Sequence, residues 1–415
     1  MAAAKPRLRL FEGYGIEIEY ALVARESLDV LSIADRVLRA KAGRTSNDAE
    51  NGPAGWSNEF MLHVMELKNS EPSPSLRGLA PMFQRQVREI NRILAAMGGR
   101  LMPTGMHPWM DPRREARLWP HRNRRIYETY DRIFGCRSHG WANIQSIHLN
   151  LPFADDGELR GLHAAARLLI PLMPAIAASS PIVEGRVTGL MDSRLAFYRE
   201  NQLLVPSIAG PVVPEEAGLG RAEYRRTILG RMYEDIAPHD PRGVLRHEWL
   251  NSRGAVPRFE RNALEIRVLD VQECPASELA VTAAVASALR ALVEGRLAPP
   301  EEQAAWPLEP LLGIFDETVR RADKAIIKDR RYLRALGLEA GKARAGELWR
   351  HLVETTLPRR AAEPAVMEAL GLILGEGPLS RRIIRATGTS PSMKRLRDVY
   401  GKLCDCLERG EPFAG

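Results

Sequence analysis

Four segments of the chain alternate between apolar and polar residues, which is the pattern of a half-buried β-strand. They span residues 14–23, 60–68, 144–153 and 264–270. In the last segment the alternation predicts two faces, with Leu264, Ile266 and Val268 opposite Glu265, Arg267 and Leu269. Because every segment has one apolar face, we expect the strands to form one antiparallel sheet whose polar faces line a common surface.

Apolar residues recur with a helical period in most of the remaining chain. Helices are predicted at residues 73–97, beginning at a Ser73-Pro74-Ser75 cap, and at 113–134, 158–178, 221–236 and 277–294. Residues 100–108 are predicted to be a short extended piece, and residues 43–58 and 179–220 to be loops rich in Gly, Asn, Ser or Arg.

The pattern changes after Pro299-Pro300, and residues 308–409 are helical in character almost throughout. A chain of 415 residues is also long for one ordinary core. The sequence therefore predicts an α+β fold with a sheet-containing domain at residues 1–295 and a C-terminal helical region at residues 296–415.

The polar faces of the predicted strands carry residue types that bind metals and anions: Glu17, Glu19, Glu66, His148, Asn150, Glu265 and Arg267. Glu17 and Glu19 are expected about 6–7 Å apart on one strand face, where two carboxylates repel. A divalent cation removes this conflict, and Mg²⁺ prefers hard oxygen ligands. Alone, Glu-x-Glu fits an exposed strand face and His148 fits a core or rim histidine. Together the set favours a metal site formed by Glu17, Glu19, Glu66, His148 and Glu265.

Arginines cluster in the same part of the chain, at Arg186, Arg194, Arg199, Arg253, Arg258, Arg261 and Arg267. Singly each fits a surface charge, but as a set they suit an anionic substrate and a triphosphate. The chain has no P-loop motif and no Gly-x-Gly-x-x-Gly after a strand. If ATP binds, metals and arginines on a sheet are expected to hold it.

The charge balance is basic, with 59 Lys+Arg against 52 Asp+Glu, a net charge of +7 and a pI of about 9.4. This allows nucleic acid as a partner, but the excess is small for the length and favours a solvated basic surface.

Four cysteines form no disulfide framework, and Met1–Leu10 lacks the apolar core of a secretory signal. The chain has no apolar run of about 18 residues, so no membrane span is predicted. We therefore expect a cytoplasmic protein without a membrane partner.

Five motifs in chain order carry a family resemblance: Gly15-Ile16-Glu17-Ile18-Glu19-Tyr20, Glu66, Ser146-Ile147-His148-Leu149-Asn150, Ser179-Ser180-Pro181 through Gly185 and Thr188-Gly189 to Arg194, and Leu264-Glu265-Ile266-Arg267-Val268-Leu269-Asp270. Over about residues 11–295 this order resembles the glutamate–cysteine ligase type 2 family, carboxylate–amine ligases of the glutamine-synthetase-like fold. The resemblance implies a curved antiparallel sheet with helices on its convex face. It also implies ATP and Mg²⁺, or Mn²⁺, on the concave face.

The resemblance also implies roles for single residues. The four glutamates match the family's metal ligands, and His148 matches the first histidine of a His-x-His strand. Asn150 stands where many members have the second histidine, which puts the details of the ATP contact in question. The expected nucleotide contacts are His148, Asn150, Lys68 and Arg258, and the expected catalytic contacts are Arg267, Arg194 and Arg261.

The function implied by the resemblance is an ATP-dependent ligase that forms an amide of the γ-glutamyl type through an acyl phosphate. Its substrates would be glutamate and an amino compound such as cysteine. Two alternatives stay open: a non-catalytic protein that binds an anion or nucleic acid on the same fold, and a metal-dependent hydrolase. A homo-oligomer is also left open.

Overall fold

The computed structural model describes residues 7–358 and 360–415. The N-terminal stretch judged not to be a signal, Met1–Leu10, therefore lies partly outside the described residues. At the centre is an eight-stranded sheet of order β2-β3-β4-β1-β6-β10-β9, in which β5 pairs with the end of β1. All its pairings are antiparallel. The strands are β1 (Gly15–Ala24), β2 (Asp48–Asn51), β3 (Ala54–Asn58), β4 (Val64–Asn69), β5 (Gly99–Met102), β6 (Ser146–Pro152), β9 (Ala255–Arg258) and β10 (Ala263–Asp270).

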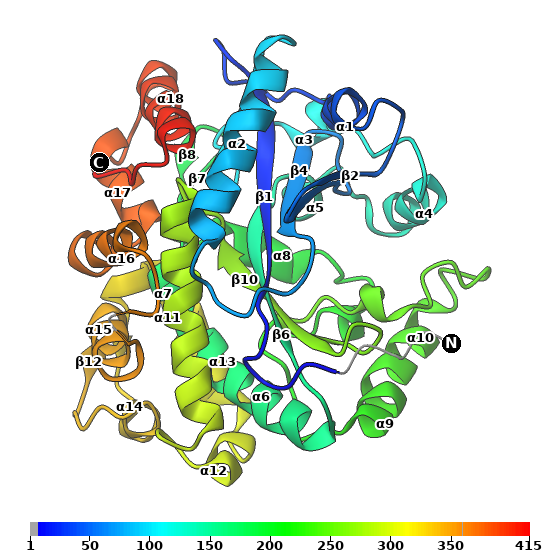
Figure 1. The fold of residues 1–415 in the computed structure, drawn as a ribbon. Coiled ribbons are helices and arrows are strands. Elements are labelled where there is room, and N and C mark those ends of the chain that lie inside the picture. Colours follow the sequence, from blue (N-terminus) through cyan, green and yellow to red (C-terminus); the bar gives the residue numbers. More distant parts are fainter. Residues whose placement is uncertain (1–6, 359) are drawn as a thin grey trace.

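Helices pack on one face of this sheet, and the predicted fold class is confirmed (Figure 1). The long helices α2 (Leu79–Ala95), α6 (Asp156–Leu169) and α11 (Pro275–Val293) contact one another or the sheet on this side. The apolar faces of the strands point toward them, and Ile16, Ile18 and Tyr20 of β1 are fully buried. The sequence pattern thus fixes which face of each strand enters the core.

Helix α11 is long and apolar enough to span a membrane, and it is the only such helix in the described part of the chain. The sequence analysis predicted no segment of this kind. In the structure 83% of its most apolar window is buried inside the protein, where it contacts other helices of the core.

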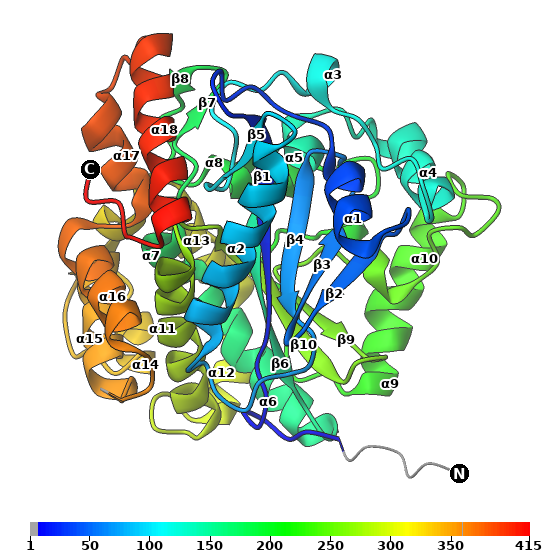
Figure 2. The same ribbon diagram turned by 45° about the horizontal axis from the view of Figure 1, so that its top comes forward.

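The C-terminal helices pack against the sheet-bearing part (Figure 2). α15 (Ala345–Thr356) and α16 (Pro364–Glu376) contact α11, whereas α18 (Met393–Arg409) contacts α2 and β5. The largest core cluster includes side chains from both sides of residue 296. The domain boundary near residues 296–307 stays a prediction.

Most of the remaining helices and strands are short. They are α1 (Ala34–Ala42), α3 (Pro112–Glu115), α4 (Arg124–Phe134), α5 (His139–Ala142), α7 (Pro174–Ala177), α8 (Ser193–Glu200), α9 (Arg221–Tyr224), α10 (Gly230–Ile236), α12 (Pro300–Ala304), α13 (Leu308–Arg321), α14 (Arg330–Ala335) and α17 (Leu379–Thr387), the helical turns η1 (Ile170–Leu172), η2 (Pro206–Ile208), η3 (Arg225–Leu229), η4 (Glu248–Leu250) and η5 (Ala322–Lys324), and the strand pairs β7 (Ile182–Val183) with β8 (Arg186–Val187) and β11 (Ile326–Ile327) with β12 (Ala343–Arg344).

Several predicted elements differ from the structure. The predicted loop at 43–58 contains the hairpin β2–β3, whose two-residue turn is Gly52-Pro53. The loop at 179–220 contains α8, and β9 was not predicted. Helix α2 begins at Leu79 after the left-handed Gly78, because Ser73 pairs with Tyr14 and does not cap a helix. The predicted strand at 60–68 begins only at Val64.

Strand β10 also departs from strict alternation. Its pairing with β6 shifts by one residue between Ile266 and Leu269, which is a β-bulge. As a result, Leu269 joins Leu264 and Val268 in the main core and does not share the polar face. Glu265 precedes the shift and keeps its predicted direction toward the polar face, which Arg267 also borders.

Candidate active site

A cleft of about 500 Å³ opens on the polar face of the sheet. The strand register brings residues far apart in the sequence together here, with Glu19 opposite Glu66 and Glu17 opposite both Lys68 and His148. All residues predicted as metal, nucleotide or catalytic contacts except Asn150 border the cleft, whereas Arg186, Arg199 and Arg253 of the predicted arginine set do not. Its charged lining, called the floor below, consists of Glu17, Glu19, Glu59, Glu66, Lys68, His148, Arg194, Arg258, Arg261, Glu265 and Arg267.

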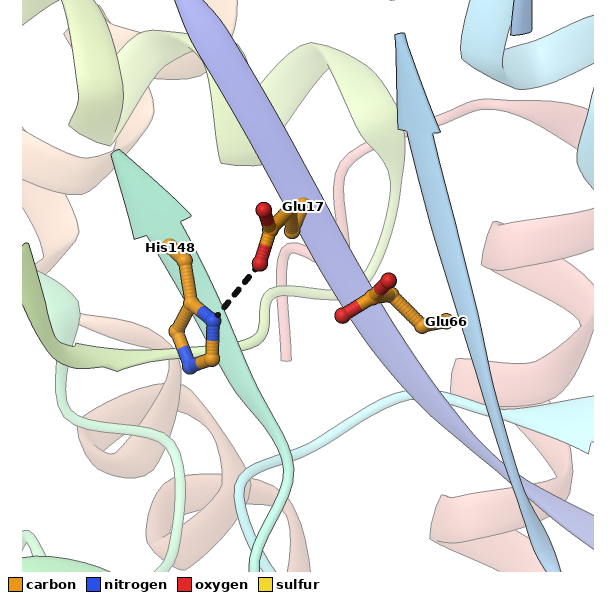
Figure 3. A group of neighbouring side chains, drawn as sticks. All are labelled: Glu17, Glu66 and His148. Carbon is orange, nitrogen blue, oxygen red and sulfur yellow. Dashed lines mark hydrogen bonds and ion pairs between the residues drawn. The ribbon is translucent and has the colours of Figure 1, made fainter. Parts of the chain in front are cut away.

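Glu17, Glu66 and His148 form the tightest group on the floor (Figure 3). They come from β1, β4 and β6, and each offers one ligand atom within 4.8 Å of the other two. Nδ1 of His148 lies 3.1 Å from Oε2 of Glu17. Burial lowers the pKa of His148, but the hydrogen bond to Glu17 and the charges of Glu19 and Glu265 outweigh burial and raise it.

The next two carboxylates are fixed by neighbouring donors. The backbone N–H and the hydroxyl of Ser146 donate to Oε2 of Glu19 at 2.8 and 2.9 Å. The hydroxyl of Ser57 and Nζ of Lys68 donate to Oε1 of Glu66 at 2.6 and 2.9 Å. Burial alone would raise the pKa of Glu66, but Lys68 and the Ser57 hydrogen bond lower it to about 2.

Glu59 belongs to the floor and was missed by the sequence analysis. It lies between β3 and β4, where no alternating pattern marks the direction of its side chain. Burial and the charges of Glu19 and Glu66 raise its pKa well above the ordinary value. Glu19 and Glu66 are themselves direct cross-strand partners, and like charges in such a pair are destabilising. A bound cation would offset the repulsion between carboxylates that lie so close together on the floor.

The donors also fit the predicted ion. Carboxylate oxygens are hard ligands of the kind that Mg²⁺ prefers, and Mn²⁺ accepts both oxygen and imidazole nitrogen. The group Glu17, Glu66 and His148 supplies both kinds of atom within a short distance. The residues present are therefore consistent with a divalent cation, with Glu19, Glu59 and Glu265 beside it.

At the other end of the floor Glu265 is paired with two arginines. Arg267 donates to Oε1 of Glu265, and Nε of Arg258 lies 3.6 Å from Oε2. Burial opposes ionisation, but Arg267 and Arg258 hold the pKa of Glu265 well below its usual range. The Nε atoms of both arginines have no hydrogen-bond partner among the described residues. Both side chains border the cleft, so their positive charge lies beside any anion bound there.

The other predicted contacts take different positions. Arg261 is exposed at the rim, 3.3 Å from Oε1 of Glu17. Asn150 lies beneath the cleft and donates to the same oxygen at 3.3 Å. Arg194 borders the cleft but is almost fully buried, with Nε on Asp270 and both terminal nitrogens on the backbone carbonyl of Arg267. Arg194 thus positions β10, and a direct role in catalysis stays a prediction.

The sequence model of a protein family described as glutamate–cysteine ligase family 2 matches residues 14–400 of the chain. The chain belongs to the glutamate–cysteine ligase family 2. This membership places it among ligases. An uncharacterized protein of Archaeoglobus fulgidus is 35% identical over 402 residues, which cover 96% of this chain and 99% of that protein. A protein of Corynebacterium efficiens, provisionally named glutamate–cysteine ligase 2-1, is 25% identical over 262 residues, which are 62% of this chain and 60% of that protein.

Solved structures share the fold of this family member at low sequence identity. Glutamate–cysteine ligase of Francisella tularensis in complex with AMP has a TM-score of 0.57 at 11% identity, covering 97% of this chain and 90% of that one. A bifunctional glutathione synthetase of Pasteurella multocida has a TM-score of 0.59 at 12% identity, covering 96% of this chain and 53% of that one. At these identities the likeness concerns the fold alone.

Proposed function

We propose that this chain is an ATP-dependent carboxylate–amine ligase that forms a γ-glutamyl amide from glutamate and an amino compound such as cysteine. One observation carries the proposal: a single cleft brings the carboxylates of β1, β4 and β10 together with Lys68, Arg258, Arg261 and Arg267. Such a floor can hold a metal–triphosphate and an anionic substrate side by side. The family membership and the relatives named glutamate–cysteine ligase support the same reaction.

The residues that would hold Mg²⁺ are Glu17, Glu66 and His148, with neighbouring carboxylates completing the site. Bound there, Mg²⁺ neutralises charge on the phosphate oxygens of ATP. Lys68 and Arg258 are the proposed nucleotide contacts of the floor, together with His148 and, through Glu17, Asn150. Phosphoryl transfer needs mainly positioning and charge neutralisation, so no protein nucleophile is required.

In the proposed reaction a carboxylate oxygen of glutamate attacks the γ-phosphorus of ATP, and ADP leaves. The amine then attacks the acyl phosphate, forms the amide and releases inorganic phosphate. Arg267 and Arg261 are the proposed contacts of the anionic groups in this exchange, because both border the cleft, Arg261 beside Glu17 and Arg267 beside Glu265. Excluding water from the acyl phosphate would be the task of the cleft walls.

We also propose a cellular location and partners for the enzyme. A cytoplasmic location is consistent with free, buried thiols at Cys136, Cys274, Cys404 and Cys406. We propose small-molecule substrates as its partners, and not nucleic acid, and keep a homo-oligomer as an open arrangement.

Phosphate release tests the proposal. Purified protein is mixed with ATP, Mg²⁺, glutamate and a panel of amines, and phosphate is measured over time. We expect release that depends on both glutamate and an amine. Absence of release with every amine, from folded protein, would contradict the proposal. Salt-sensitive binding of nucleic acid in such protein would instead favour the non-catalytic alternative, and amide cleavage without ATP would favour the hydrolase.

A further inference from the structure

Part of the cleft is lined by aromatic side chains that the chemistry of the floor does not use. Phe60, Tyr127, Tyr130, Trp141 and Trp249 border it, and we call them the aromatic wall. Their rings lie against one another, with centroid separations of 4.9 Å for Phe60–Tyr127, 5.2 Å for Tyr130–Trp141 and 5.9 Å for Tyr130–Trp249. All but Tyr130 are only half-buried, so apolar ring surface faces the open cleft.

The aromatic wall adjoins the floor directly. Phe60 follows Glu59 in the chain, and Nδ2 of Asn58 donates to the Tyr127 hydroxyl at 3.1 Å. Burial raises the pKa of Tyr130, while the charges of Arg267 and Arg258 act on the same hydroxyl in the opposite direction. A group packed on the wall would therefore sit next to the arginines and carboxylates at which the reacting atoms are expected.

Gln202 adds an unused polar group to the same cleft. Its side chain is 2% exposed, and its Nε2 donates to the Ser252 hydroxyl at 3.1 Å. Its Oε1 has no hydrogen-bond partner among the described residues. Since a buried acceptor without a partner is destabilising, a ligand N–H or O–H would relieve that cost.

We propose that the acceptor amine carries an aromatic or similarly large planar apolar group that packs on the aromatic wall, with a polar group that donates to Gln202. This inference rests on the proposed ligase function and narrows its amine substrate from amino compounds in general, cysteine among them, to amines with a large planar group. A small side chain such as that of cysteine or alanine cannot cover several rings, whereas a planar ring removes apolar surface from water on both partners.

Matched amines test the inference on the unmodified enzyme. Phenylalanine is compared with alanine, and phenethylamine with ethylamine, in the phosphate-release assay with ATP, Mg²⁺ and glutamate. Within each pair we expect kcat/KM to be roughly tenfold to a hundredfold higher for the amine with the phenyl group, the gain from burying one such ring. Equal or higher kcat/KM for the small amines overturns the inference and leaves the ligase proposal intact. No release with any amine overturns both.

Variants locate the effect. Trp249→Ala should remove most of the preference within each pair by raising KM for the aromatic amine, with KM for ATP unchanged. Gln202→Leu should raise KM for tyrosine, whose hydroxyl can donate to Oε1 of Gln202, and leave KM for phenylalanine nearly unchanged. Phe134→Leu is the matched control, because Phe134 stacks on Trp141 at 5.7 Å but does not border the cleft. We expect the control to keep the preference. A rise of KM for ATP in Trp249→Ala would overturn the inference, because it would assign the wall to the nucleotide base.

Discussion

Buried arginine–carboxylate pairs occur in two regions of this protein, and their surroundings differ. Under the C-terminal helices, Nη1 of Arg382 lies 2.6 Å from Oε1 of Glu273, and both side chains are 0% exposed. The hydroxyl of Ser277 and the backbone N–H of Phe413 also donate to this oxygen, at 3.1 and 3.2 Å. Arg382 further donates to the backbone carbonyls of Gly377 and Phe413. This sealed network leaves its ionic groups well hydrogen-bonded.

The arginine–carboxylate group on the floor of the cleft has fewer of its hydrogen bonds formed. Glu265 holds Arg267 and attracts Arg258, but Nε of each arginine lacks a hydrogen bond among the described residues, and both side chains border the cleft. Burial and pairing alone therefore do not distinguish a functional ion pair from a structural one. The useful difference is that the side chains on the floor border a cavity, because only such groups can meet a ligand.

The largest expected effect is on activity. Glu17→Gln keeps the shape of the side chain but removes a charge next to His148 and Arg261 on the floor. We expect turnover to fall on the order of a thousandfold, comparable with the loss of one electrostatic contact to a transition state. The melting temperature should change little, because this carboxylate stands among others of like charge. Glu265→Gln is also expected to lower turnover. Near-normal turnover in either variant would remove that residue from the mechanism.

The sealed pair should show the opposite response. Arg382→Met leaves Glu273 as an unpaired buried charge, which destabilises a protein by about 3–5 kcal/mol. Urea unfolding measures this loss, and turnover per folded molecule should stay near that of the unmodified enzyme. Arg385→Met is the control, because its ion pair with Glu376 is exposed and should contribute less than about 1 kcal/mol. Equal stability of the two variants would contradict the comparison.

Histidines extend the comparison to pH, with a smaller effect. Carboxylates raise the pKa of His148 in the cleft, whereas burial lowers the pKa of His163 from 6.5 to about 4. Between pH 4 and 6.5 the unfolded chain binds a proton at His163 that the folded protein does not bind. The free energy of unfolding therefore rises with pH in this range. Stability from this group is present above 6.5 and is lost as pH falls toward 4.

His163→Leu tests this, with unfolding measured at several pH values. The slope of the free energy of unfolding against pH, between pH 4 and 6.5, should decrease in the variant by an amount that corresponds to at most one bound proton. His63 and His107, whose pKa values burial also lowers to about 4, should keep the rest of the slope. An unchanged slope in the variant would show that His163 is not held neutral in the folded protein.

Much of the floor could be predicted because it lies on regular strands. In β1 the two-residue period fixes the direction of Glu17 and Glu19 once Ile16 and Ile18 are assigned to the core. The same reasoning predicts the direction of Glu66, His148 and Glu265, whereas the order in which the strands pair was not predicted. The bulge in β10 escaped prediction, because Leu269 enters the core through a shift in pairing that the pattern of one strand does not reveal.

Residues outside regular strands could not be placed from the sequence. Glu59 lies in a connection, and Trp249 belongs to the short turn η4, so neither has a period that gives its direction. The partner of Arg194 is equally hidden, since Asp270 is 76 residues away and meets it only in the folded chain. Long-range packing, which local patterns do not encode, decides these positions.

Oxygen transfer tests the central claim most directly. The enzyme is supplied with ATP, Mg²⁺, an active amine and glutamate labelled with ¹⁸O in its γ-carboxylate, and the released phosphate is examined by mass spectrometry. If the carboxylate attacks the γ-phosphorus and the amine then displaces phosphate, each phosphate carries one ¹⁸O atom. Unlabelled phosphate would mean that water attacks ATP, and it would contradict an acyl-phosphate ligase on this floor.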